Sequence, residues 1–268
     1  MIHKALPVQL TSYDILKALA VVLMVADHIG AYFLPDVLWL RVAGRLCVPM
    51  WFFLIGYARS RDLDRSLWWG ALLVILSDFI TGRYIFPLNI LVTILGVRLV
   101  LDVTMKFALK NGLTFWLIAT LLTAMIAPSA MLMQYGTQGL LLAGCGWLLR
   151  HIPVNDRRRV TYVLPYMIFC TMVFTIVQWS LFRFSIPETA VLLIGLAAVM
   201  ATLHGFYPFA LPRLTQALPM PVVSLIQMAG RHTLLIYVVH LLLIKALGLW
   251  LYPAWFSFLG WELFPPKP

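Results

Sequence analysis

Charged side chains are scarce in this sequence: Asp, Glu, Lys and Arg make up 11% of its 268 residues, against about 25% in a typical soluble domain. Hydrophobic residues make up 62%. A globular protein in water would lack the polar side chains needed to cover its surface, so a soluble fold is excluded. The composition predicts one integral membrane domain over residues 1–268.

Cysteine is also rare. Cys47, Cys145 and Cys170 each lie inside an apolar run, with no CxxC pair and no histidine spacing that suits zinc. This pattern excludes a disulfide framework, and the three thiols are expected to be small buried residues. No metal site is predicted.

Acidic residues are half as numerous as basic ones, 10 against 20, which leaves a net charge of +10. The basic residues lie in short loops between apolar stretches, as the positive-inside rule describes, so no nucleic-acid partner is predicted. The first apolar run is not followed by a small-x-small site, so it is not expected to be a cleaved signal. The sequence also lacks an internal repeat or an inverted pair of broken helices, which argues against a transporter.

Long apolar runs are what the sequence has in abundance. A transmembrane helix needs about 20 mostly apolar residues. On that basis we expect an all-α, polytopic helical bundle of about nine spans, within a range of eight to ten. A short tenth element is also considered in the tail, at Trp255, Phe256, Phe258 and Trp261. The nine predicted spans are 11–33, 37–57, 66–86, 88–108, 112–130, 133–150, 160–181, 187–207 and 224–250.

Basic residues outside these runs fall on alternate connections, which indicates the orientation of the chain. By the positive-inside rule, the connections rich in Lys and Arg lie in the cytoplasm. The amino terminus is therefore predicted to be cytoplasmic, and an odd number of spans sends the carboxyl terminus outside. The basic connections carry Lys4; Arg59, Arg61 and Arg65; Lys106 and Lys110; Arg150, Arg157, Arg158 and Arg159; and Arg213.

Ionisable residues within spans are costly, so each one is a functional hypothesis. The first span holds Asp14, Lys17, Asp27 and His28. Lys17 and His28 differ by roughly 20° around the helix and Asp14 lies about 40° to the other side, so these three form one polar stripe. At about 1.5 Å per residue, His28 lies roughly 16 Å farther from the cytoplasm than Lys17.

Alternating span directions bring polar residues of several helices to the depth of His28. Arg41 and Arg45 lie one turn apart where the second span begins, and Tyr237 and His240 share a face of the last span. Arg98 and Asp102 instead look like a local ion pair on the cytoplasmic side. The residues expected in the outer half of the membrane are Asp27, His28, Arg41, Arg45, Asp78, Arg83, Asn89 and His240.

Such a cluster suits proton transfer combined with charge stabilisation. A histidine is the usual general base, and an arginine pair can hold a phosphate or a developing oxyanion. Asp27 points about 100° away from His28, which leaves Asp14 or Asp78 to orient the imidazole. The structural alternatives are a hydrogen-bonded pair at Asp27–His28 and snorkelling of Arg41 and Arg45.

Four further residues have structural alternatives of their own. Asp78, Arg83 and Asn89 could form an ion pair or cap a helix break. His240 could be a hydrogen-bonded core histidine on an apolar face.

Several segments, in order, resemble the TraX family of conjugal transfer proteins. The runs Thr11–Ala18 and Met24–Gly30 carry the resemblance first. It continues through Leu40-Arg41, Gly44-Arg45, Pro49, Trp51–Leu54 and Gly56, and the later segments Gln134-Tyr135-Gly136 and Gln138-Gly139 are similar to the family's "YG" motif. The opening LPVQLTSYDILKALA is similar to the TrbP branch, found on plasmids whose conjugative pilin is cyclic.

This resemblance implies a role in pilin maturation in the bacterial inner membrane. The founding member acetylates the amino terminus of F-type pilin, with acetyl-CoA as donor. A cyclic pilin has no free amino terminus, so the acyl acceptor can be a side chain and the transferred group can differ. The family is distantly similar to other membrane acyltransferases, and Gly230–Leu234 with Tyr237 and His240 resembles their "GR-x-S/T-L … Y … H" element.

The resulting hypothesis is a membrane acyltransferase that modifies the conjugative pilin subunit. The donor is acetyl-CoA, or a membrane phospholipid that would need no cytoplasmic channel; pilin and membrane lipids are the expected partners. A permease with an intramembrane charge relay and a non-catalytic assembly factor remain alternatives. By motif position the resemblance implies site roles for Asp27, His28, Arg41, Arg45 and His240. The hypothesis assigns catalysis to His28, Asp27 and Arg45, and substrate binding to Arg41, Asp14, Lys17, Asp78, Arg83, Asn89, Tyr237 and His240.

Overall fold

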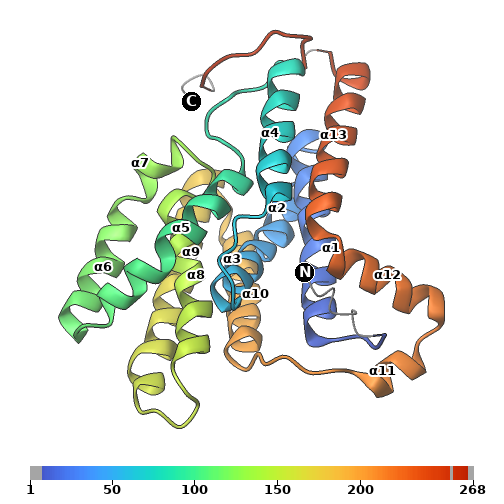
Figure 1. Ribbon diagram of the computed structural model, residues 1–268. Coiled ribbons are helices and arrows are strands. Elements are labelled where there is room, and N and C mark those ends of the chain that lie inside the picture. Colours follow the sequence, from blue (N-terminus) through green and yellow to red (C-terminus); the bar gives the residue numbers. More distant parts are fainter. Residues whose placement is uncertain (1–7, 254–255, 265–268) are drawn as a thin grey trace.

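The computed structural model describes residues 8–253 and 256–264, and the named elements in this part of the chain are all helical (Figure 1). The predicted all-α class is therefore confirmed. The elements are α1 (Ser12–Tyr32), α2 (Leu38–Arg45), α3 (Cys47–Tyr57), α4 (Arg65–Ile80), α5 (Ile90–Ala108), α6 (Gly112–Ala124), α7 (Ile126–Ala130), α8 (Gly136–His151), the π-helical turn η1 (Arg159–Val163), α9 (Leu164–Phe182), α10 (Ile186–His204), α11 (Pro212–Ala217), α12 (Met220–Arg231) and α13 (Thr233–Leu251).

Five helical stretches in the described ranges are long and apolar enough to cross a membrane. Large apolar side chains also face outward from the bundle, as lipid contact requires; Val22 is 63% exposed and Ile194 69%. We conclude that the chain is a multi-pass membrane protein, while the count of nine spans stays a prediction. The five stretches are Ser12–Tyr32, Leu38–Tyr57, Arg159–Phe182, Ile186–His204 and Thr233–Leu251.

The helices form two flanks joined by a central group (Figure 1). On one flank α13 packs against both α1 and α4, and on the other α8 contacts α5, α6 and α9. Helix α3 lies between them and packs closely on α8, because a Cβ atom at Gly56 would meet the carbonyl of Ala143 and one at Gly146 would meet the carbonyl of Phe53. Small residues thus let these two backbones touch, as is common between membrane helices.

Two of the predicted spans are broken within their length, each four residues before a proline. Helix α2 ends at Arg45, and Pro49 has no N–H to donate to the carbonyl of that residue. Helix α6 ends at Ala124 for the same reason, with Pro128 in the following turn. The first break positions the carboxyl end of α2, and with it Arg45, beside α1.

The last predicted span, 224–250, is wrong at its start. The chain instead forms α12 and then α13, with a break at His232. Helix α12 lies across α1: a Cβ atom at Gly230 would meet the backbone of Asp14 at 2.7 Å, and Arg231 forms an ion pair with Asp14. These contacts hold α12 against the amino-terminal end of α1. The last membrane helix, α13, therefore begins only at Thr233.

The tail beyond α13 contains no helix in residues 256–264, so the short tenth element is not seen there, and Trp255 lies outside the described residues. The tail instead pairs with the α4–α5 connection, where the N–H of Phe86 donates to the carbonyl of Leu263 at 2.8 Å. Phe256 is 2% exposed and its ring stacks on Tyr32. The tail therefore covers the upper end of α1 and α4.

Candidate functional site

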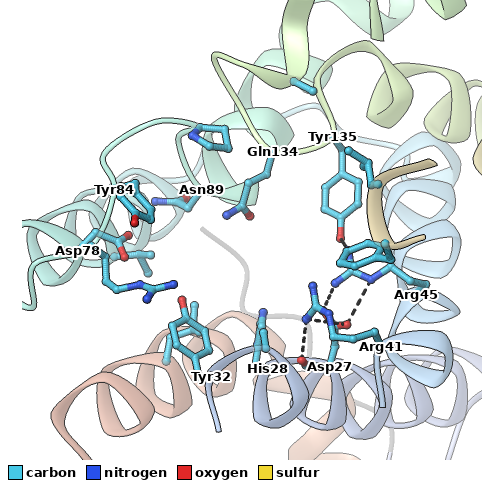
Figure 2. Close-up of a pocket in the computed structure, with 18 of the residues that line it drawn as sticks. Asp27, His28, Tyr32, Arg41, Arg45, Asp78, Tyr84, Asn89, Gln134 and Tyr135 are labelled. Carbon is cyan, nitrogen blue, oxygen red and sulfur yellow. Dashed lines mark hydrogen bonds and ion pairs between the residues drawn. The ribbon is translucent and has the colours of Figure 1, made fainter. Parts of the chain in front are cut away.

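A cavity of about 440 Å³ opens among the ends of several helices (Figure 2). Side chains from α1, α2, α4, α7, α8, α9 and α13 and from two connections line it. Figure 2 shows His28, Tyr32 and Gln134 pointing into this space. The ionisable groups and amides of the wall are Asp27, His28, Arg41, Arg45, Asp78, Arg83, Asn89, Gln134, Gln138, Gln178 and Lys245, with Tyr32, Tyr84, Tyr135 and Tyr237.

Asp27 is shared by two arginines at one end of the cavity. Nη1 of Arg41 lies 3.0 Å from Oδ1 of Asp27 and also donates to its backbone carbonyl at 2.8 Å. Arg45 donates from Nε to Oδ1 at 3.2 Å and from Nη2 to Oδ2. One carboxylate therefore faces two guanidinium groups, which leaves this end with one excess positive charge. Gly44 makes the contact possible, because a Cβ atom there would collide with Asp27.

Two aromatic residues hold the arginine pair in place. The guanidinium carbons of Arg41 and Arg45 lie 4.9 and 5.1 Å from the ring centre of Phe182. Arg45 also donates from Nη1 to the hydroxyl of Tyr135 at 2.7 Å. Snorkelling to the interface does not describe these side chains, since both guanidinium groups are held by Asp27 within the cavity wall. Sequence reasoning missed both aromatics as members of the site, although Tyr135 belongs to the quoted "YG" segment.

His28 forms a direct hydrogen bond to a second imidazole. Its Nδ1 lies 2.6 Å from Nε2 of His240, and Nδ1 of His240 lies 2.6 Å from the carbonyl oxygen of Ile236. A carbonyl can only accept, so in the neutral rings His240 donates from Nδ1 and accepts at Nε2. His28 must then donate from Nδ1, which leaves an unprotonated Nε2.

This arrangement corrects the expectation that a carboxylate orients His28. Asp14 is engaged by Arg231, and Asp78 by Lys245. The hydrogen bond to His28 comes from His240 of α13 instead. Packing of α13 against α1 sets this contact, and nothing in the spacing of one helix specifies it.

Lys245 is a member of the cavity wall that sequence reasoning missed. Its side chain is 1% exposed, and its Nζ donates to Oδ1 of Asp78 at 2.7 Å and to the hydroxyl of Ser77 at 2.8 Å. The carbonyl of Val74 is a third, longer partner at 3.4 Å. The signal was present, since a lysine in the middle of the run Leu241–Leu247 is costly in a membrane. This ion pair ties α13 to α4.

Three other predicted residues also reach the cavity. Arg83 lies over the rings of Tyr32 and Phe256, 5.3 Å from each ring centre. Asn89 accepts from the N–H of Leu91 and donates to the carbonyl of Ala71, so it caps α5, as the structural alternative proposed. Tyr237 is 7% exposed and its ring lies 5.9 Å from that of His28.

Two predicted residues lie elsewhere. Thr11 caps α1 by accepting from the N–H of Asp14, while the Asp14 carboxylate accepts from the N–H of Thr11 and pairs with Arg231 at 3.1 Å. Lys17 lies over the ring of Tyr13, 5.8 Å from its centre. Neither residue lines the cavity around His28. The stripe predicted along α1 therefore reaches the cavity only at its upper end, because its lower end packs against α12.

The predicted ion pair between Arg98 and Asp102 is also wrong. Asp102 accepts from Arg61 at 3.3 Å and from the indole N–H of Trp147 at 2.7 Å. Arg98 donates to the carbonyl of Asp62.

Comparison with known proteins identifies the family of this chain. The sequence profile of the TraX protein family matches residues 12–211, about three quarters of the chain. The chain belongs to the TraX protein family. The resemblance drawn from its motifs is thereby confirmed. Helix α13, which supplies His240 and Lys245 to the site, follows the matched region, as does α12.

Among curated proteins, this TraX-family chain is similar to an uncharacterized protein of Rickettsia prowazekii (strain Madrid E). The two are 35% identical over 86 residues, which cover 31% of this chain and 34% of the relative. The chain thus spans about a third of the length of the curated relative that it matches. No solved structure matches it.

Proposed function

We propose that this TraX-family protein is a membrane acyltransferase that modifies the conjugative pilin subunit during pilus maturation. The family is associated with conjugal pilin modification, which supports the choice of partner. The protein would lie in the bacterial inner membrane with its amino terminus in the cytoplasm, so that the cavity opens in the outer half of the bilayer. The test is a fusion of the amino terminus to a reporter enzyme that is active only outside the cytoplasm. Activity of this fusion would contradict the proposed orientation.

The observation that carries the proposal is the imidazole pair. With the hydrogen bonds from His28 to His240 and from His240 to Ile236, Nε2 of His28 is unprotonated and keeps its lone pair, and His28 lines a polar cavity. An imidazole nitrogen in this state is suited to act as a general base, and a second ring that fixes its tautomer takes the part that a carboxylate plays in many hydrolases. His28 is therefore assigned as the base and His240 as its positioning residue.

In the proposed reaction, Nε2 of His28 takes a proton from an amine or hydroxyl group of pilin. The nitrogen or oxygen of that group bonds to the acyl carbonyl carbon of the donor. The bond from this carbon to the donor's sulfur or oxygen then breaks, and the proton on His28 passes to the leaving group, which departs as a thiol or an alcohol. Asp27 and Tyr135 hold the guanidinium group of Arg45, which would stabilise the oxyanion that forms.

The charge of the cavity supports an anionic donor. Among the described residues of its wall, Arg41, Arg45, Arg83 and Lys245 face only two carboxylates, Asp27 and Asp78. The excess is two positive charges, counting histidine as neutral. Acetyl-CoA and phospholipids both carry phosphate, which guanidinium groups bind with two parallel hydrogen bonds. Either donor fits this excess, and the two are distinguished by experiment.

The test is intact mass spectrometry of pilin from cells that carry the wild-type protein, His28→Ala or the control His204→Ala. His204 lies at the end of α10, outside the cavity wall. We expect unmodified pilin with His28→Ala and modified pilin with the control. Pilin of wild-type mass in cells with His28→Ala would overturn the role of His28. Purified protein in nanodiscs, supplied with isotope-labelled acetyl-CoA or labelled phospholipid, then identifies the donor by which label reaches pilin.

A further inference from the structure

Two buried glutamines form part of the same cavity wall and have no role in the proposed chemistry. Gln138 of α8 is 2% exposed and Gln178 of α9 is 1% exposed. Nε2 of Gln178 donates to Oε1 of Gln138 over 3.5 Å, which is long for such a bond. Nε2 of Gln138 and Oε1 of Gln178 have no hydrogen-bond partner in the described part of the chain.

Turning both amide groups by 180° exchanges donor and acceptor but keeps a single bond within the pair. A single bond between two glutamines uses one carbonyl oxygen and one N–H, whichever residue donates. One oxygen and one NH₂ group therefore always remain. Polar groups buried without partners are costly, and the large majority in proteins find a partner. Protein atoms cover both groups, but both residues line the cavity, so a bound molecule can supply both partners once the side chains turn toward it.

The glutamine pair lies beside the arginine end of the cavity. Gln178 precedes Phe182 by one helical turn, about 6 Å along α9, and the ring of Phe182 lies under Arg41 and Arg45. On the facing helix, the N–H of Gln138 donates to the carbonyl of Tyr135, whose hydroxyl accepts from Arg45. A ligand held by the arginines thus has its neighbouring atoms next to the two amides.

We propose that Gln138 and Gln178 form a binding site for a secondary amide group of a substrate. Such a group carries one N–H and one C=O, and these match the oxygen and the NH₂ group that the pair leaves without partners. This proposal rests on the acyltransferase function and refines it by naming the chemistry that the site recognises. No charge is involved, so the site complements the arginines and does not compete with them for phosphate.

Two substrates of the proposed reaction contain secondary amides. The pantetheine arm of CoA has them, and so does the polypeptide backbone of pilin. An ester-linked glycerophospholipid acyl chain has none, so with a phospholipid donor the amide would come from pilin. The same chemistry therefore has two sources, and binding measurements separate them.

The test measures binding to the full-length protein in nanodiscs, with variants Gln138→Leu and Gln178→Leu and the control Gln216→Leu. Gln216 is an exposed residue of α11 outside the cavity wall. The probes are CoA, adenosine 3′,5′-bisphosphate, which has phosphates but no amide arm, and purified pilin. We expect each cavity variant to weaken the binding of CoA or of pilin by about tenfold, as the loss of one or two hydrogen bonds implies. The binding of the bisphosphate should stay unchanged.

Each outcome decides one point. Weaker binding of CoA with unchanged binding of pilin assigns the amide to the pantetheine arm of the donor. Weaker binding of pilin with unchanged binding of CoA assigns it to the polypeptide. Unchanged binding of both, or an equal loss for the bisphosphate, overturns the amide site. Binding is measured without turnover. The result therefore does not depend on whether pilin modification is seen in the mass experiment, and the two proposals can fail separately. Thermal unfolding of the double leucine variant gives a second readout: a large loss of stability with intact binding would show that the pair only joins α8 to α9.

Discussion

Nδ1 of His28 donates to Nε2 of His240 across the contact between α1 and α13. We expect His240→Leu to lower the rate of pilin modification by about 100-fold, since the tautomer of His28 is no longer fixed and general-base catalysis contributes about 10² to 10⁴. His240→Gln keeps an oxygen that can accept from Nδ1, so it should restore part of the rate. The measurement is the initial rate of label transfer to pilin in nanodiscs. Equal rates for the two variants would show that His240 only fills space.

The guanidinium group of Arg45 contacts Asp27 at both oxygens and Tyr135 at its hydroxyl. Arg45→Lys keeps the charge but cannot make this forked set of bonds. We expect the KM for the donor to rise about tenfold and kcat to fall, because an ammonium group binds phosphate as a single point charge. The matched control is Arg213→Lys on the exposed surface of α11, which should keep wild-type constants. Unchanged kinetics for Arg45→Lys would remove Arg45 from the site.

The buried Lys245 forms an ion pair with the partly exposed Asp78 between α13 and α4. Removing one partner leaves the other charge unpaired inside the protein, which costs about 3–5 kcal/mol where that charge is fully buried, as it is for Lys245. We therefore expect Lys245→Met and Asp78→Leu each to lower the thermal unfolding temperature strongly. Replacement of both by apolar residues should recover most of the loss, because no unpaired charge remains. Additive losses in this double-mutant cycle would mean that the two side chains stabilise the protein separately.

Gly44 lies against Asp27 so closely that a Cβ atom there would collide with its Cα and Cβ atoms. We expect Gly44→Ala to push α2 from α1, to separate the arginines from Asp27 and to abolish pilin modification. Gly96→Ala in α5 is the control, since a Cβ atom there meets nothing within 4 Å. Alanine favours a helix over glycine by about 0.5–1 kcal/mol, so this variant should be slightly more stable and fully active. Wild-type activity in Gly44→Ala would contradict the packing at this site.

Depth along each helix was predictable from the sequence. Asp27, Arg41 and Asp78 were placed at one level by the rise per residue and the alternation of span direction, and all three line the cavity. The breaks after Arg45 and Ala124 also had a signal in the sequence, namely a proline four residues later. The scarcity of charge and the long apolar runs were enough to predict the helical membrane class.

Partners across helices were decided by the tertiary structure. Which side chain meets His28 depends on the rotation of α13 about its own axis and on its place beside α1, and the same packing gives Asp78 to Lys245 and Asp14 to Arg231. A sequence determines the face of a helix on which a residue lies. It does not determine which neighbouring helix that face meets, because this depends on the packing of the whole bundle, down to close contacts such as those at Gly44 and Gly230.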